Sequence, residues 1–213
     1  MSLFSKEEAQ LLEQIMRSRR DVRGNRFIDK PISKEVIDQI LDAGISAPSL
    51  GFSQPWEFVL INDLELRNKV KTSFFEENEK AKELFEGEKL DAYSRLKLEG
   101  ITESALNIAV FYKPSNHPVL GQTAMEEAGV YSVVCAIQNM WLMARALNVG
   151  LGWVSILDPN KVKKVLNAPA NRQLIGYLCL RYVDVFYENP ELERLKWAKR
   201  KSKNDVVIQN KYE

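Results

Sequence analysis

The chain has 213 residues, of which 30 are basic and 29 are acidic, giving a formal net charge of +1. This balance excludes a global electrostatic attraction to nucleic acid or to a membrane surface, and a hydrophobic content of 45% excludes a disordered chain. The first residues become charged at once, and no apolar run reaches the roughly 18 residues of a membrane span. We therefore expect a cytoplasmic protein without a signal peptide.

A capped helix is predicted from Ser5 to about Arg19, because Ser5 is a good N-cap and the apolar residues that follow recur at helical spacing. These apolar residues are Ala9, Leu12, Ile15 and Met16.

Three arginines then fall within five residues, in Arg19-Arg20-Asp21-Val22-Arg23. Guanidiniums this close together repel one another unless an anion lies among them, and phosphate matches their planar geometry. The segment therefore indicates a phosphorylated ligand. The alternative is a solvated basic end of the preceding helix.

A second helix is predicted after Pro31-Ile32-Ser33, and it leads to a loop of small residues and prolines between Ala47 and Trp56. Such a loop lets backbone approach a flat ligand, while Ser49 and Gln54 offer hydrogen bonds. The alternative is an ordinary turn before the strand predicted at residues 56–61.

The second half of the chain alternates helices and strands. Residues 64–98 are charged and helical, and we expect a lid within residues 74–100. The helix predicted at residues 129–147 is apolar around nearly its whole circumference, so it must be buried all round. The helix is buried either against a second subunit or, as the central core helix of a monomer, against the rest of its own chain.

Further strands are predicted at residues 108–112, 150–156 and 175–183, and a short helix at residues 161–166. The lysine-rich tail from Lys196 onward is predicted to lie on the surface. Without a regular βαβ period, this order predicts an α+β fold with a mixed sheet flanked by helices. No linker interrupts it, so we expect a single domain over residues 1–213.

Several common kinds of site are absent from the sequence. Cys135 and Cys179 lie in separate apolar runs, which favours buried, reduced thiols over a disulfide. His117 is the single histidine, so neither a typical zinc site nor a Ser-His-Asp triad is predicted, and we expect no metal. There is no GxxxxGK[ST] loop, and Gly150-Leu151-Gly152 lacks the third glycine of a dinucleotide fingerprint. An enzyme built on these residues therefore needs an organic cofactor.

Three motifs occur in a characteristic order: the arginine segment, then Ala-Pro-Ser-x-Gly-x-x-Gln-Pro-Trp at residues 47–56, then Gly-x-Gly-Trp-Val-Ser at residues 150–155. In this order the chain resembles the flavin-binding nitroreductase superfamily. Within it, Asp21, residues 96–101 and residues 131–141 are most similar to 5,6-dimethylbenzimidazole synthases of the BluB type. The resemblance covers about residues 17–193.

The resemblance implies a homodimer with FMN bound at the subunit interface. It implies that Arg19, Arg20 and Arg23 hold the phosphate and ribityl end, with Arg200 as a further phosphate ligand. Pro48, Ser49 and Gln54 would contact the flavin from the partner subunit. The full implied cofactor-binding set is Arg19, Arg20, Asp21, Val22, Arg23, Pro48, Ser49, Gln54, Leu98, Ser155 and Arg200.

In BluB-like enzymes reduced FMN reacts with dioxygen and is converted to the lower-ligand base of vitamin B12. The resemblance implies catalytic roles for Asp21, as acid or base at the ribityl chain, and for Ser155, as a hydrogen-bonding group at the flavin N5. We expect the neighbouring arginines to keep Asp21 ionised, which favours the base role. The alternatives are that Asp21 only orients arginines and that Ser155 simply ends a strand. Trp56, Trp141 and Trp153 are interpreted as packing residues.

Other functions remain open at this point. An NAD(P)H-dependent nitroreductase or quinone reductase would share the fold and the FMN pocket. A dehalogenase-like relative, a non-catalytic flavin-binding protein and an unrelated α+β domain are further alternatives. Whether a separate flavin reductase or NAD(P)H supplies the electrons is also open.

Overall fold

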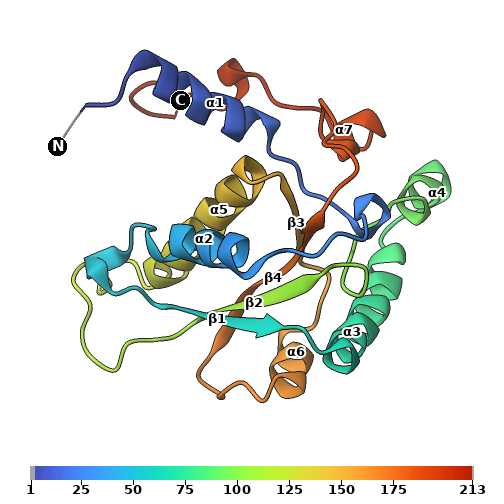
Figure 1. Ribbon diagram of the computed structural model, residues 1–213, viewed down its shortest axis with the longest axis horizontal. Coiled ribbons are helices and arrows are strands. Elements are labelled where there is room, and N and C mark those ends of the chain that lie inside the picture. The colour runs from blue at the N-terminus through green and yellow to red at the C-terminus, as the bar shows by residue number, and fades with distance from the viewer. Residues whose placement is uncertain (1–2, 213) are drawn as a thin grey trace.

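A four-stranded antiparallel sheet forms the centre of the computed structural model, which describes residues 3–212 (Figure 1). Its strand order is β1-β2-β4-β3. The strands are β1 (Trp56–Ile61), β2 (Leu106–Tyr112), β3 (Val149–Val154) and β4 (Gln173–Tyr182). All four were predicted to within a few residues, and the α+β class is confirmed. The expectation of a mixed sheet is wrong, because all three strand pairs are antiparallel; the parallel pairing that the structure does show is an isolated bridge between Asp21 and Leu151, outside the strands.

Helices cover both faces of the sheet (Figure 1). On one face lie α2 (Lys34–Ile45) and α5 (Ala128–Ala146), and on the other lie α3 (Leu64–Lys82) and α6 (Pro159–Val165). The central strand β2 is buried on both sides, because alternate residues such as Ile108 and Ala109 enter different apolar clusters.

Helix α5 is buried on one side only within this chain. Val133, Ile137 and Met140 pack toward the sheet, whereas Tyr131 and Val134 point outward and are exposed. In a single chain, apolar side chains along the outward side of α5 therefore stay exposed to solvent. Cys135 lies on the outward side and is exposed, so its predicted burial is wrong. The prediction for Cys179 is confirmed, since that thiol is buried, and both cysteines are free.

Three helices lie outside the sheet layers. They are α1 (Lys6–Ser18), α4 (Gly87–Ser94) and α7 (Glu191–Arg194). Ser5 and Glu8 form a capping box at the start of α1, as the N-cap prediction required, yet no residue of α1 is buried. Three short 3₁₀ segments span Gly24–Arg26, Leu50–Phe52 and Lys203–Asp205.

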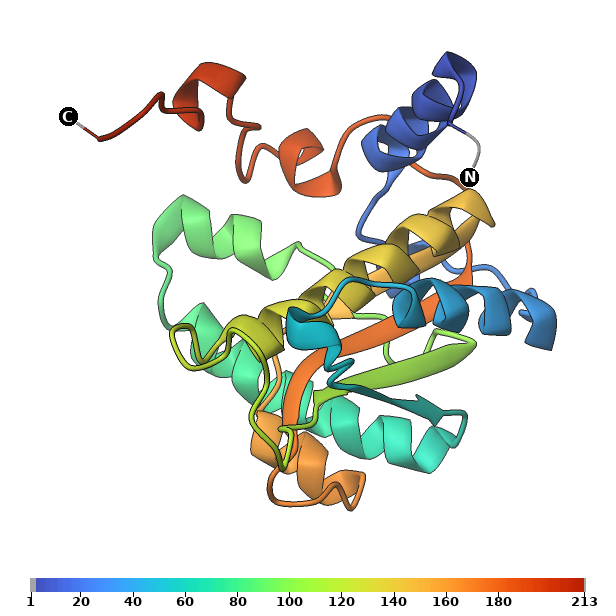
Figure 2. The ribbon, with the colours of Figure 1, turned by 90° about the vertical axis from the view of Figure 1, so that its left-hand side faces the viewer.

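The predicted lid region divides into two parts. Val70 and Phe74 of α3 are buried against the sheet, so α3 belongs to the core, and α4 is the part that stands outside it. The tail beyond α7 extends away from the body of the molecule above α4 (Figure 2), and its residues 198–212 are exposed, as predicted. Across residues 3–212, every helix is too short or too polar to cross a membrane.

Candidate functional site

The arginine segment is fixed against the edge strand β3. The N–H of Val22 donates to the carbonyl of Leu151 at 3.1 Å. A Cβ atom at Gly152 would lie only 2.1 Å from the Val22 carbonyl oxygen, so the contact requires glycine at that position. Gly152, whose motif lacks the third glycine of a dinucleotide fingerprint, thus lets the arginine segment lie directly on β3.

Asp21 is held by two partners on this edge. One carboxylate oxygen accepts the backbone N–H of Trp153 at 3.0 Å, and the other pairs with the Arg23 guanidinium. Arg23 also donates to the Trp153 carbonyl at 3.1 Å. Asp21 therefore binds the N–H of Trp153 and Arg23 binds its carbonyl, and these bonds together orient the Asp21 carboxylate.

Desolvation by the surrounding protein raises the pKa of Asp21, although Arg23, the Trp153 N–H and Arg19 all act to lower it. The sequence led us to expect the opposite direction, because the arginines are visible in the sequence and the enclosure of the carboxyl against β3 is not. The raised pKa brings this group closer to the neutral range in which acids and bases exchange protons.

A cavity of about 190 Å³ lies beside this segment, and Arg19, Arg20, Asp21 and Arg200 all line it. Pro190, Glu191 and Leu192 also line it. Arg200 comes from the tail, about 180 positions along the chain from Arg20. The structure therefore brings together four of the predicted site residues.

The arginines that line this cavity differ in the partners that their guanidinium groups bind. Arg20 donates to the carbonyls of Tyr187 and Glu188 and so joins the segment before α7 to the arginine segment. Arg19 stacks over the Trp141 ring at 4.4 Å, and in the described part of the chain neither it nor Arg200 forms an ion pair with a carboxylate. Burial lowers the pKa of Arg19; the Asp21 carboxylate acts to raise it, and the charge of Arg200 acts to lower it further. Two cations facing one cavity fit an anionic group such as phosphate.

The loop at residues 47–56 is distant from this cavity in one chain. It lies against the N-terminal half of α5, where Pro48 and Ser49 line a shallow groove with Tyr131. Trp141, which contacts Arg19, is ten residues further along the helix, a rise of about 15 Å. The chain by itself therefore does not bring Pro48, Ser49 and Gln54 to the arginines.

The loop nevertheless has a defined and strained shape. The Ser49 hydroxyl accepts the N–H of Gln54 at 3.0 Å, and Ser132 of α5 accepts the N–H of Leu50 at 3.1 Å. Phe52 and Gln54 have positive φ angles of 54° and 45°. Non-glycine residues in this conformation are strained, and such strain concentrates at binding sites.

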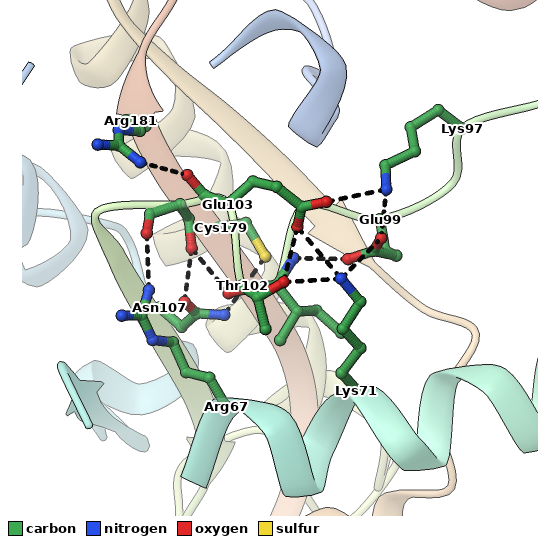
Figure 3. Close-up of polar contacts among 11 residues, drawn as sticks. Arg67, Lys71, Lys97, Glu99, Thr102, Glu103, Asn107, Cys179 and Arg181 are labelled. Atoms are coloured by element: carbon green, nitrogen blue, oxygen red, sulfur yellow. Dashed lines mark hydrogen bonds and ion pairs between the residues drawn. The ribbon is translucent and has the colours of Figure 1, made fainter. Parts of the chain in front are cut away.

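A partly buried ionic cluster surrounds Glu99, the residue after Leu98 (Figure 3). Glu99 is 3% exposed and accepts a hydrogen bond from Lys97 at 2.6 Å. Lys97 also donates to Glu103 at 3.0 Å, and Lys71 of α3 lies 3.5 Å from Glu103. Although burial acts in the other direction, these lysines lower the pKa of Glu103 to about 2.

The same segment is joined to the arginine segment. The N–H of Gly24 donates to the Glu99 carbonyl at 3.0 Å, so Leu98 is held one residue from this junction and is half-buried. Ser155 is exposed, two residues after the Trp153 that binds Asp21. Val22 is buried, and its N–H and carbonyl both face β3, so the structure gives this residue a role in holding the segment on the strand.

Sequence reasoning assigned Trp141 to packing and did not single out Trp197. Besides stacking under Arg19, Trp141 donates its indole N–H to the Arg20 carbonyl at 3.0 Å. The contacts of Trp141 with Arg19 and Arg20 join residues more than 100 positions apart in the chain, and no local pattern reveals them. The same holds for the contacts of Trp197 with Phe85 and Tyr93. His117 is exposed in its loop, as predicted.

Comparison with known proteins places these features in a family. The model of the nitroreductase family matches residues 16–181. A 5,6-dimethylbenzimidazole synthase of Rhodospirillum rubrum is 42% identical over 89% of this chain and 90% of its own length. A 5,6-dimethylbenzimidazole synthase of Rhodobacter capsulatus is 36% identical over 91% of this chain and 94% of its own.

A solved structure has a similar fold. It is an oxidised iodotyrosine deiodinase bound to FMN and 3-iodo-L-tyrosine, and it superimposes with a TM-score of 0.72 over 94% of this chain and 99% of its own. Its sequence identity is 20%, so the likeness bears on the fold alone.

Proposed function

The chain belongs to the nitroreductase family, and from this we propose that it is an FMN-dependent oxidoreductase of the 5,6-dimethylbenzimidazole synthase type. It converts reduced FMN and dioxygen to the lower-ligand base of vitamin B12. The observation that carries the proposal is the convergence of Arg19 and Arg200 with Asp21 on one cavity.

The residues of this cavity fit a flavin phosphate. Arg19 and Arg200 supply two guanidiniums without carboxylate partners among residues 3–212, and a phosphate between them relieves their mutual repulsion. Arg20 and Arg23 bind protein acceptors, but each guanidinium has further N–H groups that can donate to the ribityl end.

The flavin ring requires a second subunit in this proposal. Pro48, Ser49 and Gln54 lie too far along α5 to reach the cavity of their own chain, whereas a partner copy can present them. The exposed apolar side of α5, with Tyr131 and Val134, is the surface that such a homodimer buries. The homodimer therefore completes the site.

The chain's own residues then have distinct tasks. Reduced FMN, when bound, supplies the electrons for dioxygen and the carbon atoms of the product. Arg23 and the Trp153 N–H orient Asp21, which accepts or returns a proton at the ribityl chain. Ser155 donates a hydrogen bond near the flavin N5. Helix α4 and the segment around Leu98 exclude bulk water.

We place the reaction in the cytoplasm, where the free thiols of Cys135 and Cys179 remain reduced. Reduced FMN comes from a separate flavin reductase or from NAD(P)H.

One experiment tests the proposal. The purified protein is mixed without oxygen with stoichiometric reduced FMN, air is admitted, and the products are identified by mass spectrometry. We expect 5,6-dimethylbenzimidazole from the wild type and none from Asp21→Asn or Ser155→Gly. Recovery of intact, oxidised FMN from the wild type contradicts the proposal and favours the NAD(P)H-dependent nitroreductase or quinone reductase, which steady NAD(P)H oxidation with such an acceptor then identifies.

A further inference from the structure

The tail contacts the outlying helix α4 through an aromatic cluster. The Trp197 ring meets the Phe85 ring at 5.4 Å and the Tyr93 ring at 6.0 Å, while Phe85 and Tyr93 stack on each other at 4.9 Å. The Lys89 ammonium of α4 lies 3.5 Å from the centre of the Trp197 ring, a close cation–π contact. In Figure 2 the tail passes above α4.

Tyr93 joins this aromatic cluster to the core of the molecule. Tyr93 is 7% exposed, and its hydroxyl donates to Asn78 of α3 at 2.8 Å. Because α3 packs on the sheet, the position of Trp197 is defined relative to the body of the protein and to α4 together.

A tight turn directs Trp197 onto α4. After α7 ends, Lys196 adopts a positive φ of 57°, and the N–H of Trp197 donates to the Leu192 carbonyl at 2.8 Å. Leu192 itself lines the arginine cavity. The turn therefore joins the wall of the cavity directly to the residue that rests on α4.

Arg200 follows Trp197 by three residues, so their Cα atoms are at most about 11 Å apart. Arg200 lines the cavity, yet residues 198–212 are exposed. Within residues 3–212, Arg200 itself is held by a single weak hydrogen bond, from its N–H to the Glu193 carboxylate at 3.5 Å. The contacts of Trp197 are thus the strongest restraint near Arg200.

From these contacts we propose that Trp197 is a positioning residue that couples α4 to Arg200, so that binding of the FMN phosphate and docking of the tail on α4 strengthen each other. The proposal rests on the phosphate site argued above. Such coupling is reciprocal: a phosphate held by Arg200 steadies α4, and a docked α4 strengthens phosphate binding. A tryptophan that merely covers α4 affects folding but has no preference for a phosphorylated flavin.

The test compares FMN with riboflavin, which lacks the phosphate, by fluorescence titration of the full-length protein. We expect Trp197→Ala to weaken FMN binding at least tenfold and riboflavin binding less than twofold. Lys89→Ala, a milder change, is expected to act in the same direction. Lys199→Ala removes one exposed tail charge without touching the cluster and serves as the matched control.

A double variant shows whether Trp197 acts through Arg200. We expect Trp197→Ala with Arg200→Ala to bind FMN no more weakly than Arg200→Ala alone. Additive losses, or equal losses for FMN and riboflavin, overturn the proposal. If Trp197→Ala fails to fold, Lys89→Ala takes its place: Lys89→Ala with Arg200→Ala is then expected to bind FMN no more weakly than Arg200→Ala alone.

Hydrogen exchange at residues 87–94 provides a readout that does not depend on the chemistry. We expect FMN to slow exchange there in the wild type more than riboflavin does, and Trp197→Ala to abolish the difference. If the wild type forms no 5,6-dimethylbenzimidazole but FMN still protects residues 87–94 more than riboflavin does, only the proposed reaction is contradicted. Equal protection by both flavins in the wild type overturns the coupling.

Discussion

Asp21 accepts the backbone N–H of Trp153 at 3.0 Å, which places a carboxylate from the arginine segment at the end of β3, two residues before Ser155. The two proposed catalytic residues are therefore positioned by one strand. Arg23 completes the arrangement by binding both Asp21 and the Trp153 carbonyl.

The pH dependence of the reaction follows from this arrangement. Burial raises the pKa of Asp21 above its ordinary value of 3.8, so its base form is gained only as the pH rises through that higher pKa. We expect product formation to increase with pH through an apparent pKa above 3.8. Asp21→Asn is expected to lower the rate by about 10²- to 10⁴-fold and to remove this limb.

Rates measured across pH with stoichiometric reduced FMN check this prediction, with Asp38→Asn on the exposed side of α2 as the control. A wild-type rate that is independent of pH, or an Asp21→Asn variant that keeps the limb, contradicts the base role.

The close contact at Gly152 predicts a second effect. A Cβ there would lie 2.1 Å from the Val22 carbonyl oxygen, and this neighbour is backbone, which cannot turn aside as the end of a flexible side chain can. We expect Gly152→Ala to lower the free energy of unfolding by about 1–3 kcal/mol and to weaken FMN binding, because the arginine segment must move off β3. Urea denaturation and FMN titration measure the two effects.

Gly44→Ala is the control for this variant, because its Cβ would crowd the buried Met140 side chain at 2.8 Å, away from the arginine segment. We expect it to lower stability and to leave FMN affinity unchanged. FMN affinity at the wild-type level in Gly152→Ala, despite a loss of stability, would show that the segment's position on β3 does not matter for binding.

Local patterns were enough to predict the secondary structure. The Ser5 cap, the apolar runs of the strands and the spacing in α5 are properties of short segments, and each corresponds to an observed element. The convergence of Arg19 with Arg200 was predicted only through the family resemblance, since about 180 residues separate them.

The remaining features depend on tertiary packing. The exposure of Cys135 follows from which side of α5 meets the sheet, and the raised pKa of Asp21 follows from its enclosure at β3. Neither the composition nor the spacing of the sequence fixes these environments. The contact of Trp197 with α4 is likewise set by a turn at a single residue, Lys196.

The ionic cluster beside Leu98 predicts a change of stability at acid pH. Because the pKa of Glu103 falls from 4.5 to about 2, its carboxylate stabilises the fold above pH 4.5, and this contribution is lost as the pH falls toward 2. We expect Glu103→Gln to cost only about 1 kcal/mol at pH 7, since the side chain is 34% exposed and partly screened.

Urea denaturation of Glu103→Gln and the wild type between pH 7 and pH 2 measures this contribution. The difference is expected to shrink below pH 4.5 and to disappear near pH 2. Glu126→Gln, at an exposed position, is expected to show no such trend. A Glu103→Gln difference that stays constant with pH would mean that the cost arises from packing rather than from charge.

The strained loop allows binding and folding to be separated at Gln54. Its φ of 45° is unfavourable for a side chain and favourable for glycine, so Gln54→Gly relieves about 1 kcal/mol of strain while removing the amide. We expect an unchanged or higher melting temperature together with FMN binding weakened about five- to thirtyfold, the value of one or two hydrogen bonds. Phe52→Gly relieves similar strain at a position with φ of 54° and an 81% exposed side chain, and it is expected to leave FMN binding unchanged. Equal FMN affinity in both variants would remove Gln54 from the flavin site, because relief of strain would then account for every effect of the substitution.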